Sequence, residues 1–229
     1  MVMVSFKEFV SMVHKYDPLK DQGPIEVRRR SFLNAEHYAQ TPISLKRAFT
    51  AFFRGNEIVQ LSRTDVFNSV LNDDVDLFVL KVLFWGFNKN QRGRCRYVFE
   101  SWKEVRSYAS DLLVSPNITS EQYKNQYLPK IKKCNHVDIA FFSKLMYFAK
   151  ASIDGHKCII LDSNVVNGIK CIDDKRFDRL RAVTKYYSSS SYVSFLEQIS
   201  ILIEDPQLKV EPDRIEYALF LIGKKQKQK

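Results

Sequence analysis

Apolar residues recur every three or four positions along most of the chain, which is the spacing that places them on one face of an α-helix. The first clear case covers residues 5–16 and ends at Asp17-Pro18, because the residue before a proline avoids the helical conformation. The same spacing predicts helices at 25–39, from Pro42 to about Gly55, from Asp73 or Asp74 to 86, and at 97–113. We expect the polar, basic segment NKNQRGRCR at 88–96 to be a loop.

A second group of helical patterns follows Ser115-Pro116-Asn117. Thr119 or Ser120 can cap a helix that Pro129 kinks or ends, and further apolar patterns predict helices at 137–150, 163–170, 192–204 and 212–223. The last residues, KKQKQK at 224–229, have nothing to bury and are expected to form a disordered basic tail. The chain is therefore predicted to be a single domain over 1–229, in two helical lobes of about 1–115 and 116–223.

The composition agrees with a helical protein. With seven glycines and seven prolines in 229 residues, the chain has about half the usual supply of turn residues that many-stranded sheets need. Hydrophobic residues make up 45% and aromatic residues 13%, which provides a core and excludes general disorder. We predict an all-α fold, a two-lobed helical bundle.

Charge and cysteine spacing restrict the kind of partner and site. The net charge of +10 favours a polyanionic partner such as DNA. The four cysteines form no CxxC pair, so we expect no metal site, no cofactor and reduced, buried thiols. No uncharged apolar run approaches the roughly 20 residues that span a bilayer, and no secretory leader is recognisable, so we expect a cytoplasmic protein, nucleoid-associated if prokaryotic, with no membrane partner.

Common catalytic motifs are missing from the sequence. There is no P-loop, no GxSxG, no HExxH and no HxH or DxD pair, and the four histidines are scattered. Phosphate-cradling, serine-hydrolase and zinc-protease sites therefore have no support.

Residues 130–169 carry the most informative pattern: a helix, a short turn at Cys134-Asn135-His136, a second helix, a return loop and a third helix. Lys144 lies among large apolar residues of the second helix, where an amine is partly desolvated and can act as a nucleophile. Asp162 follows the apolar run CIIL and precedes SNVVNGI, the position of a helix N-cap.

The two residues are separated by 18 positions, and the chain geometry allows their side chains to meet. A helix over 144–152 advances roughly 12 Å, and the seven residues that lead to Asp162 can return roughly 20 Å when extended. We therefore expect the carboxylate to lie beside the lysine.

The strings FFSKLMYFA at 141–149 and ILDSNV at 160–165 resemble the helix-hairpin-helix DNA glycosylases, in particular the 8-oxoguanine DNA glycosylase-like (OGG-like) branch. In that family a lysine opens the second hairpin helix and an aspartate caps the next helix. Here Cys134-Asn135-His136-Val137 stands where the family usually has a glycine-rich hairpin. The resemblance implies a helix-hairpin-helix element and a monomer that needs no cofactor.

The resemblance also implies a function. The protein would flip a damaged or modified base, an oxidised purine or a hypermodified base, out of duplex DNA and excise it. Lys144 would be the nucleophile, with associated AP-lyase activity, and Asp162 would stabilise the positive charge that develops on the sugar. Asn135 and His136 would contact DNA from the hairpin.

Other side chains are candidates for holding the substrate. Arg92 and Arg94 in the basic segment are predicted to contact the phosphate backbone, and Trp85 and Phe142 to form part of a base pocket. Two other functions stay open at this point. One is a non-enzymatic helical DNA-binding protein that uses the hairpin for phosphate contacts, and the other is a structural or toxin-type interaction protein. In either case Lys144 would be an ordinary lysine and Asp162 only a cap.

Overall fold

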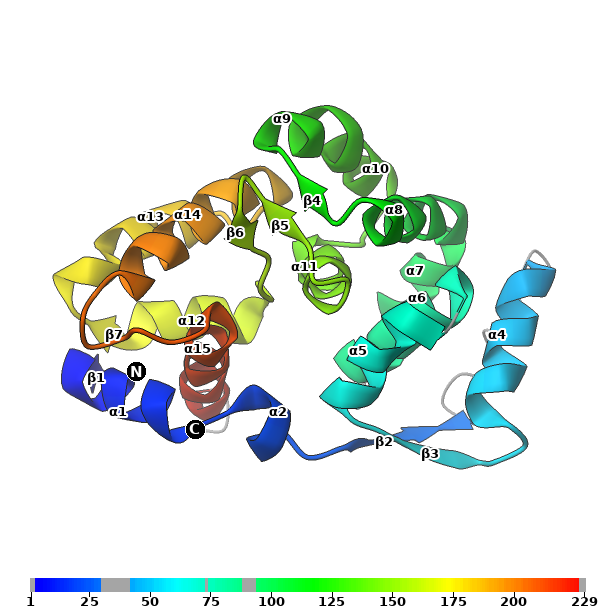
Figure 1. Ribbon diagram of the computed structural model, residues 1–229, viewed down its shortest axis with the longest axis horizontal. Helices are drawn as coiled ribbons and strands as arrows, with labels where there is room; N and C mark the ends of the chain where they lie inside the picture. Colours follow the sequence, from blue (N-terminus) through cyan, green and yellow to red (C-terminus); the bar gives the residue numbers. More distant parts are fainter. Residues whose placement is uncertain (1–2, 30–41, 73, 88–93, 227–229) are drawn as a thin grey trace.

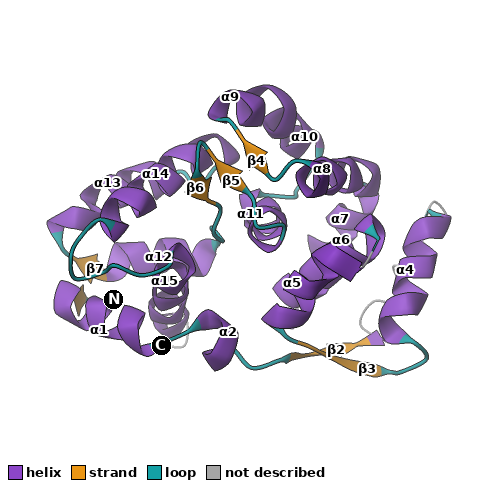
Figure 2. Ribbon diagram, viewed as in Figure 1, coloured by secondary structure: helices purple, strands orange, loops and turns teal. Residues whose placement is uncertain are grey.

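The computed structural model describes residues 3–29, 42–72, 74–87 and 94–226. Helices hold most of these residues, as predicted, and three small sheets that the sequence pattern did not predict join them (Figures 1 and 2). No helix in this part of the chain is both long and apolar enough to cross a membrane.

The elements of the first half are short and follow one another closely. The strands are β1 (Val4–Ser5), β2 (Ile25–Arg28) and β3 (Ile58–Leu61). The helices are α1 (Phe6–Lys15), α2 (Pro18–Asp21), α4 (Ile43–Phe53), α5 (Arg63–Asn72), α6 (Val75–Gly86), α7 (Arg94–Glu100) and α8 (Trp102–Val114).

The second half begins with β4 (Asn117–Ile118), α9 (Ser120–Gln122) and a π-helical turn (Tyr123–Tyr127). It continues with α10 (Leu128–Lys133), α11 (Ile139–Phe148), β5 (Ser152–Ile153), β6 (His156–Lys157), α12 (Ser163–Cys171) and β7 (Ile172–Asp173). Two 3-10 turns (Lys175–Phe177 and Ser189–Ser191) flank α13 (Asp178–Thr184), and α14 (Tyr192–Ile203) and α15 (Pro212–Gln226) end the described chain.

Side-chain caps fix several of the predicted helix starts. Ser5 forms a capping box with Glu8, and Thr119 forms one with Gln122. Asp74 accepts a hydrogen bond from the backbone N–H of Leu77, which confirms the predicted start of α6. These local signals explain why the helix positions were readable from the sequence.

Three predicted elements are wrong in part. Residues 25–28 form a strand paired antiparallel with β3, from Ile25 opposite Leu61 to Arg28 opposite Ile58, rather than the start of a helix, while 30–41 lie outside the described residues. The predicted helix at 97–113 is two helices that meet at Ser101. Within the segment predicted as a loop, 94–96 belong to α7, and 88–93 are outside the described residues.

The predicted basic tail also starts too early. Residues 224–226 belong to α15 and 227–229 lie outside the described residues. Ile222 and Gly223 are buried, and Gly223 packs against α12, so the last turn of α15 continues directly from residues that packing holds in place. Composition alone could not predict this packing.

Two glycines let α12 and α15 cross with their backbones in contact. A Cβ added at Gly168 would lie 2.1 Å from the carbonyl oxygen of Leu219, and one at Gly223 would lie 1.9 Å from that of Asn164. No side chain fits in either place. This close crossing brings the start of α12 next to the last turns of α15.

The N-terminal helix lies with the C-terminal ones. Strand β1 pairs in parallel with β7, placing Val4 opposite Ile172, and α1 packs against α15. Helices α4, α5, α6 and α8 gather on the other side, and α11 contacts α5, α6 and α8 (Figure 1). The division into lobes at residue 115 stays a prediction, but α1 belongs to the group of helices that follows it.

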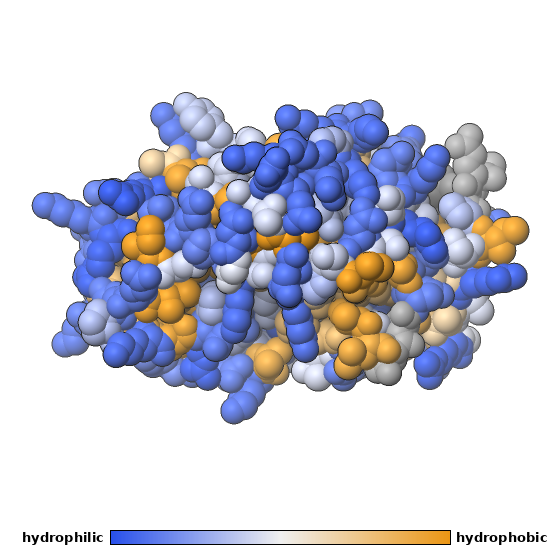
Figure 3. Space-filling view, turned by 45° about the horizontal axis from the view of Figure 1, so that its top comes forward, coloured by the Kyte–Doolittle hydropathy of each residue, from blue (hydrophilic) through white to orange (hydrophobic). Residues whose placement is uncertain are grey.

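Polar side chains cover most of the face drawn in Figure 3, and apolar ones appear there as separate patches. The exposed large hydrophobic residues in the described chain come from many different elements, as is normal for a protein surface: Met3, Leu19, Ile43, Ile58, Leu71, Val114, Tyr186 and Ile201. The core beneath them is rich in phenylalanine.

Candidate active site

Lys144 occupies the middle of α11, a helix whose side chains are nearly all buried. Asp138 caps this helix by accepting a hydrogen bond from the backbone N–H of Ala140. The side chain of Lys144 is only 9% exposed, and its Nζ donates a hydrogen bond to the carbonyl oxygen of Ala140 at 3.0 Å. A lysine held in this way has a fixed ammonium position rather than a mobile one.

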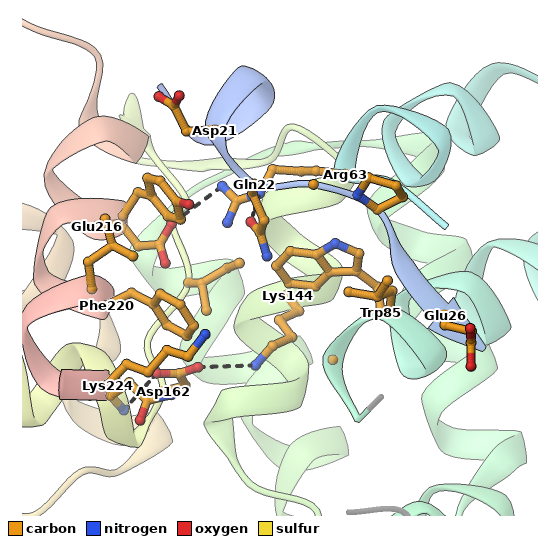
Figure 4. A pocket seen from close by; sticks show the side chains of 18 of the residues that line it. Asp21, Gln22, Glu26, Arg63, Trp85, Lys144, Asp162, Glu216, Phe220 and Lys224 are labelled. Atoms are coloured by element: carbon orange, nitrogen blue, oxygen red, sulfur yellow. Dashed lines mark hydrogen bonds and ion pairs between the residues drawn. The ribbon is translucent and has the colours of Figure 1, made fainter. Parts of the chain in front are cut away.

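Asp162 is the N-cap of α12, as the sequence predicted. Its Oδ1 accepts hydrogen bonds from the backbone N–H groups of Asn164 and Val165, at 2.8 and 3.0 Å. Its Oδ2 lies 3.8 Å from Lys144 Nζ, which confirms the expected meeting of the two side chains (Figure 4). The two oxygens therefore have separate partners, one structural and one in the site.

A buried serine joins the two segments that carry this pair. Ser143 Oγ accepts a hydrogen bond from the backbone N–H of Leu161 at 3.0 Å. Ser143 directly precedes Lys144 in the chain, and Leu161 directly precedes Asp162. The turn between β5 and β6 reverses the chain, with Asp154 and Gly155 both at positive φ. Ser143 was not predicted, because a serine within an apolar helix gives no signal of its partner.

A cavity of about 830 Å³ opens beside the pair. This volume is in the range typical of small-molecule sites. Its walls come from the segment between α2 and β2, from the adjoining ends of α5 and α6, from α11, from the start of α12, and from α15. The residues that carry its chemistry are Gln22, Arg63, Trp85, Lys144, Asp162, Glu216, Phe220 and Lys224 (Figure 4).

Arg63 is buried at the inner wall, only 2% exposed. Its NH1 donates a hydrogen bond to Tyr147 Oη at 2.8 Å, and its Nε donates one to Gln22 Oε1 at 3.0 Å. The guanidinium also lies near the rings of Trp85 and Tyr147, each 5.0 Å from the ring centre. This arginine therefore ties Gln22, from the segment that follows α2, to α11.

Glu216 of α15 is the anionic partner of Arg63, with 3.5 Å between Oε2 and NH1. Burial raises the pKa of Glu216 to about 7, although the guanidinium of Arg63 opposes the rise. Glu216 Oε2 and Trp85 Nε1 are buried without a hydrogen-bond partner in the described residues. These two residues belong to the cavity lining, but both atoms are closed off from solvent and lack the partner that buried polar atoms usually have.

Neither Arg63 nor Glu216 was predicted as a site residue. Arg63 lies outside the predicted helices, and Glu216 looked like an ordinary polar position of the predicted helix at 212–223, because the sequence does not show that the two side chains meet. Their ion pair is recognisable only in the folded structure, where the two side chains meet.

The family comparison agrees with this geometry. Residues 18–220 match the family model described as "Putative 8-oxoguanine DNA glycosylase OGG-like protein". The chain belongs to this OGG-like family. No curated protein and no solved structure matches the chain. Membership supports a DNA glycosylase activity, with DNA as the partner.

In this OGG-like protein, the two residues predicted for the base pocket lie in different surroundings. Trp85 lines the cavity, as a base-pocket residue would. Phe142 does not: it is fully buried and packs on the ring of Tyr108, with ring centres 4.8 Å apart. A role for Phe142 in the base pocket therefore stays a prediction, and its aromatic signal fits that of a core residue.

The predicted DNA-contacting residues fall in two places. Asn135 and His136 are exposed in the turn between α10 and α11, and the His136 ring lies 4.4 Å from that of Tyr97. Arg94 is the first residue of α7, but its side chain lies outside the described residues, as does all of Arg92. A helix, a turn and a helix therefore stand where the hairpin is predicted, while the hairpin identity itself remains a prediction.

The described residues of this OGG-like protein contain no group of three potential ligands placed to hold a metal ion. All four cysteines are buried as free thiols. Burial raises the pKa of Cys158 to about 12, so this thiol stays protonated near neutral pH.

Proposed function

We propose that this OGG-like protein excises a damaged or modified base from DNA after flipping it into the cavity, with Lys144 as the nucleophile and AP-lyase activity as a consequence. The observation that carries the proposal is the approach of Lys144 Nζ to Asp162 Oδ2, 3.8 Å, in the wall of a cavity large enough for a nucleotide. Family membership supports the reaction class.

Lys144 has the surroundings that a nucleophilic amine requires. It is almost buried, and the carboxylate of Asp162 lies 3.8 Å from its Nζ. Once its ammonium has lost a proton, the amine nitrogen forms a bond to C1′ of the sugar while the C1′–N bond to the base breaks. The departing base takes that electron pair and a proton. Loss of the second amine proton and opening of the sugar ring give a Schiff base, which promotes strand cleavage on the 3′ side.

Asp162 suits the electrostatic role. Positive charge develops on the sugar as the bond to the base breaks, and a carboxylate already fixed by two backbone N–H groups needs no reorganisation to stabilise it. Its second oxygen faces Lys144 and is placed to accept the proton of the ammonium group.

The cavity walls supply what an extrahelical base needs. Trp85 and Phe220 offer aromatic surface, while Glu216 and Gln22 offer polar groups for a base edge. An oxidised purine and a hypermodified base both remain candidate substrates. Outside the cavity, Asn135, His136, Arg92 and Arg94 are proposed to contact the DNA backbone.

Reduction with borohydride tests the nucleophile. The protein is incubated with duplex DNA that contains an abasic site, and reduction of the Schiff base then links protein and DNA covalently. We expect trapping by the wild-type protein and none by Lys144→Ala. Lys170→Ala is the matched control, because Lys170 is exposed at the far end of α12. Trapping of Lys144→Ala at the wild-type level would overturn the assignment.

The base is identified in a separate experiment. Free bases released from oxidised DNA and from DNA with naturally hypermodified bases are measured by mass spectrometry, with Lys144→Ala as the background. Release of one class above that background identifies the substrate, and release of none from any DNA contradicts the glycosylase proposal.

A further inference from the structure

Four cationic side chains line the cavity, and three of them have a carboxylate partner. Arg28 pairs with Glu26 at 2.5 Å, Arg63 with Glu216 at 3.5 Å, and Lys144 with Asp162 at 3.8 Å. The fourth is Lys224, and among the described residues no carboxylate oxygen lies within 4.0 Å of its Nζ. Within the described part of the chain, the cavity therefore contains one lysine that forms no ion pair within 4.0 Å.

Lys224 is exposed to solvent, but its side chain lies along the cavity wall. It lies on the last turn of α15, one turn beyond Phe220, and its Nζ is 5.8 Å from the centre of the Phe220 ring. Figure 4 shows the side chain running along that ring, with the ammonium group directed into the cavity above Asp162. The contact of Gly223 with the backbone of Asn164 fixes this turn of the helix.

Glu26 lies on the wall opposite Lys224, as Figure 4 shows. Asp21, at the end of α2, lies on the α15 side near Tyr217, about two turns along the helix from Lys224. An anion that enters beside the last turn of α15 would thus meet the ammonium of Lys224. Among the groups of a DNA strand, the one that carries charge is the phosphate.

We propose that Lys224 binds a phosphate group next to the nucleotide that enters the cavity. Lys224 lies beyond the matched residues 18–220 of the family model, so family membership assigns it no role. The inference rests on the proposed function, because it takes DNA as the molecule that fills the cavity. It adds an orientation: the backbone of the target strand passes on the α15 side, and the base points toward Arg63 and Trp85.

The test measures binding without chemistry. The probe is duplex DNA with a single tetrahydrofuran residue, an abasic analogue that has no group at C1′ and forms no Schiff base. A second duplex carries neutral methylphosphonates on both sides of that residue. The proteins are wild type, Lys224→Ala, Lys224→Arg and Lys225→Ala. Lys225 is the matched control, since it is the next residue on α15, is equally exposed and does not line the cavity.

On the first duplex we expect Lys224→Ala to bind about tenfold more weakly, as for loss of a charged hydrogen bond. The slope of log affinity against log salt should fall by about one in magnitude, because one phosphate contact is lost. Lys224→Arg and Lys225→Ala should keep the wild-type slope. On the methylphosphonate duplex, wild type and Lys225→Ala should weaken while Lys224→Ala loses nothing further.

Three results would overturn the proposal. They are an unchanged slope in Lys224→Ala, an equal change in Lys225→Ala, or the same methylphosphonate effect in Lys224→Ala as in wild type. Borohydride trapping on abasic DNA at saturating protein separates this outcome from failure of the proposed function. Lys224→Ala should still form the covalent product, because Lys144 keeps its amine, and Lys225→Ala should trap as wild type does. Loss of trapping in Lys224→Ala alone would make Lys224 the reacting amine and overturn its phosphate role. If the wild-type protein fails to trap, the nucleophile assignment fails, while the methylphosphonate comparison still decides the role of Lys224.

Discussion

Gly86 lies directly against the side chain of Lys144. A Cβ added at Gly86 would be 3.0 Å from Lys144 Cδ and 3.3 Å from Cε, closer than such atoms normally approach. Gly86 is the last residue of α6, where glycine disfavours the helix relative to alanine. The absence of a side chain there leaves the space that Lys144 needs to reach Asp162.

Gly86→Ala is therefore expected to displace the Lys144 amine while the fold is kept. A shift of about 1 Å in a reacting group lowers rates by as much as about a hundredfold, so the rate of borohydride trapping should fall at least about tenfold. Thermal unfolding should change little, because the flexible lysine moves rather than the backbone. A wild-type trapping rate in Gly86→Ala would show that the added methyl group does not displace the Lys144 amine.

Asp162→Asn separates the two roles of that residue. Asparagine is as good an N-cap as aspartate, so the loss of stability should be under about 1 kcal/mol. Loss of the negative charge should lower single-turnover base release by about a hundredfold or more. A thermal melt and an excision assay on the same preparation check both expectations. A rate that falls only in proportion to stability would leave Asp162 as a cap alone.

The crossing of α12 and α15 should not tolerate a methyl group. In an ordinary helix Gly→Ala stabilises by about 0.5 to 1 kcal/mol. At Gly168 or Gly223 the new Cβ would collide with backbone atoms of the other helix, so we expect destabilisation of at least about 2 kcal/mol. Urea unfolding measures the free energy, and a stabilised variant would contradict the close crossing.

Glu216 gives stability a specific pH dependence. Its pKa is raised by burial to about 7 in the folded protein, from a usual value of 4.5, so the folded state binds the extra proton between these values. The contribution of this group to stability therefore falls as the pH rises from about 4.5 to 7, by an amount on the order of 3 kcal/mol.

Glu216→Gln should remove this component. The variant is expected to be less stable overall, because Arg63 loses its partner, but its disadvantage against wild type should shrink as the pH rises from 5 to 8. Denaturant unfolding at several pH values measures the difference. A disadvantage that stays constant over this range would mean that Glu216 is ionised throughout.

The sequence by itself determined most of the helices and the central pair. Helical spacing and N-caps are local properties, so α1, α6 and α12 could be located from a few residues each. The meeting of Lys144 and Asp162 was also expected, because 18 residues of helix and return loop allow it and the family resemblance implies it. Both predictions depend on short-range chain geometry.

Only the tertiary structure decided the rest of the site. Strand β2 forms because β3 pairs with it, and no periodicity within 25–28 identifies that partner. Arg63 and Glu216 acquire their ion pair, and Lys224 its place in the cavity, from the packing of α5, α11 and α15. The position of α15 in turn depends on its backbone contacts with α12 at Gly168 and Gly223. Contacts between residues far apart in the chain leave little trace in local sequence, because each partner satisfies the pattern of its own helix equally well without the other.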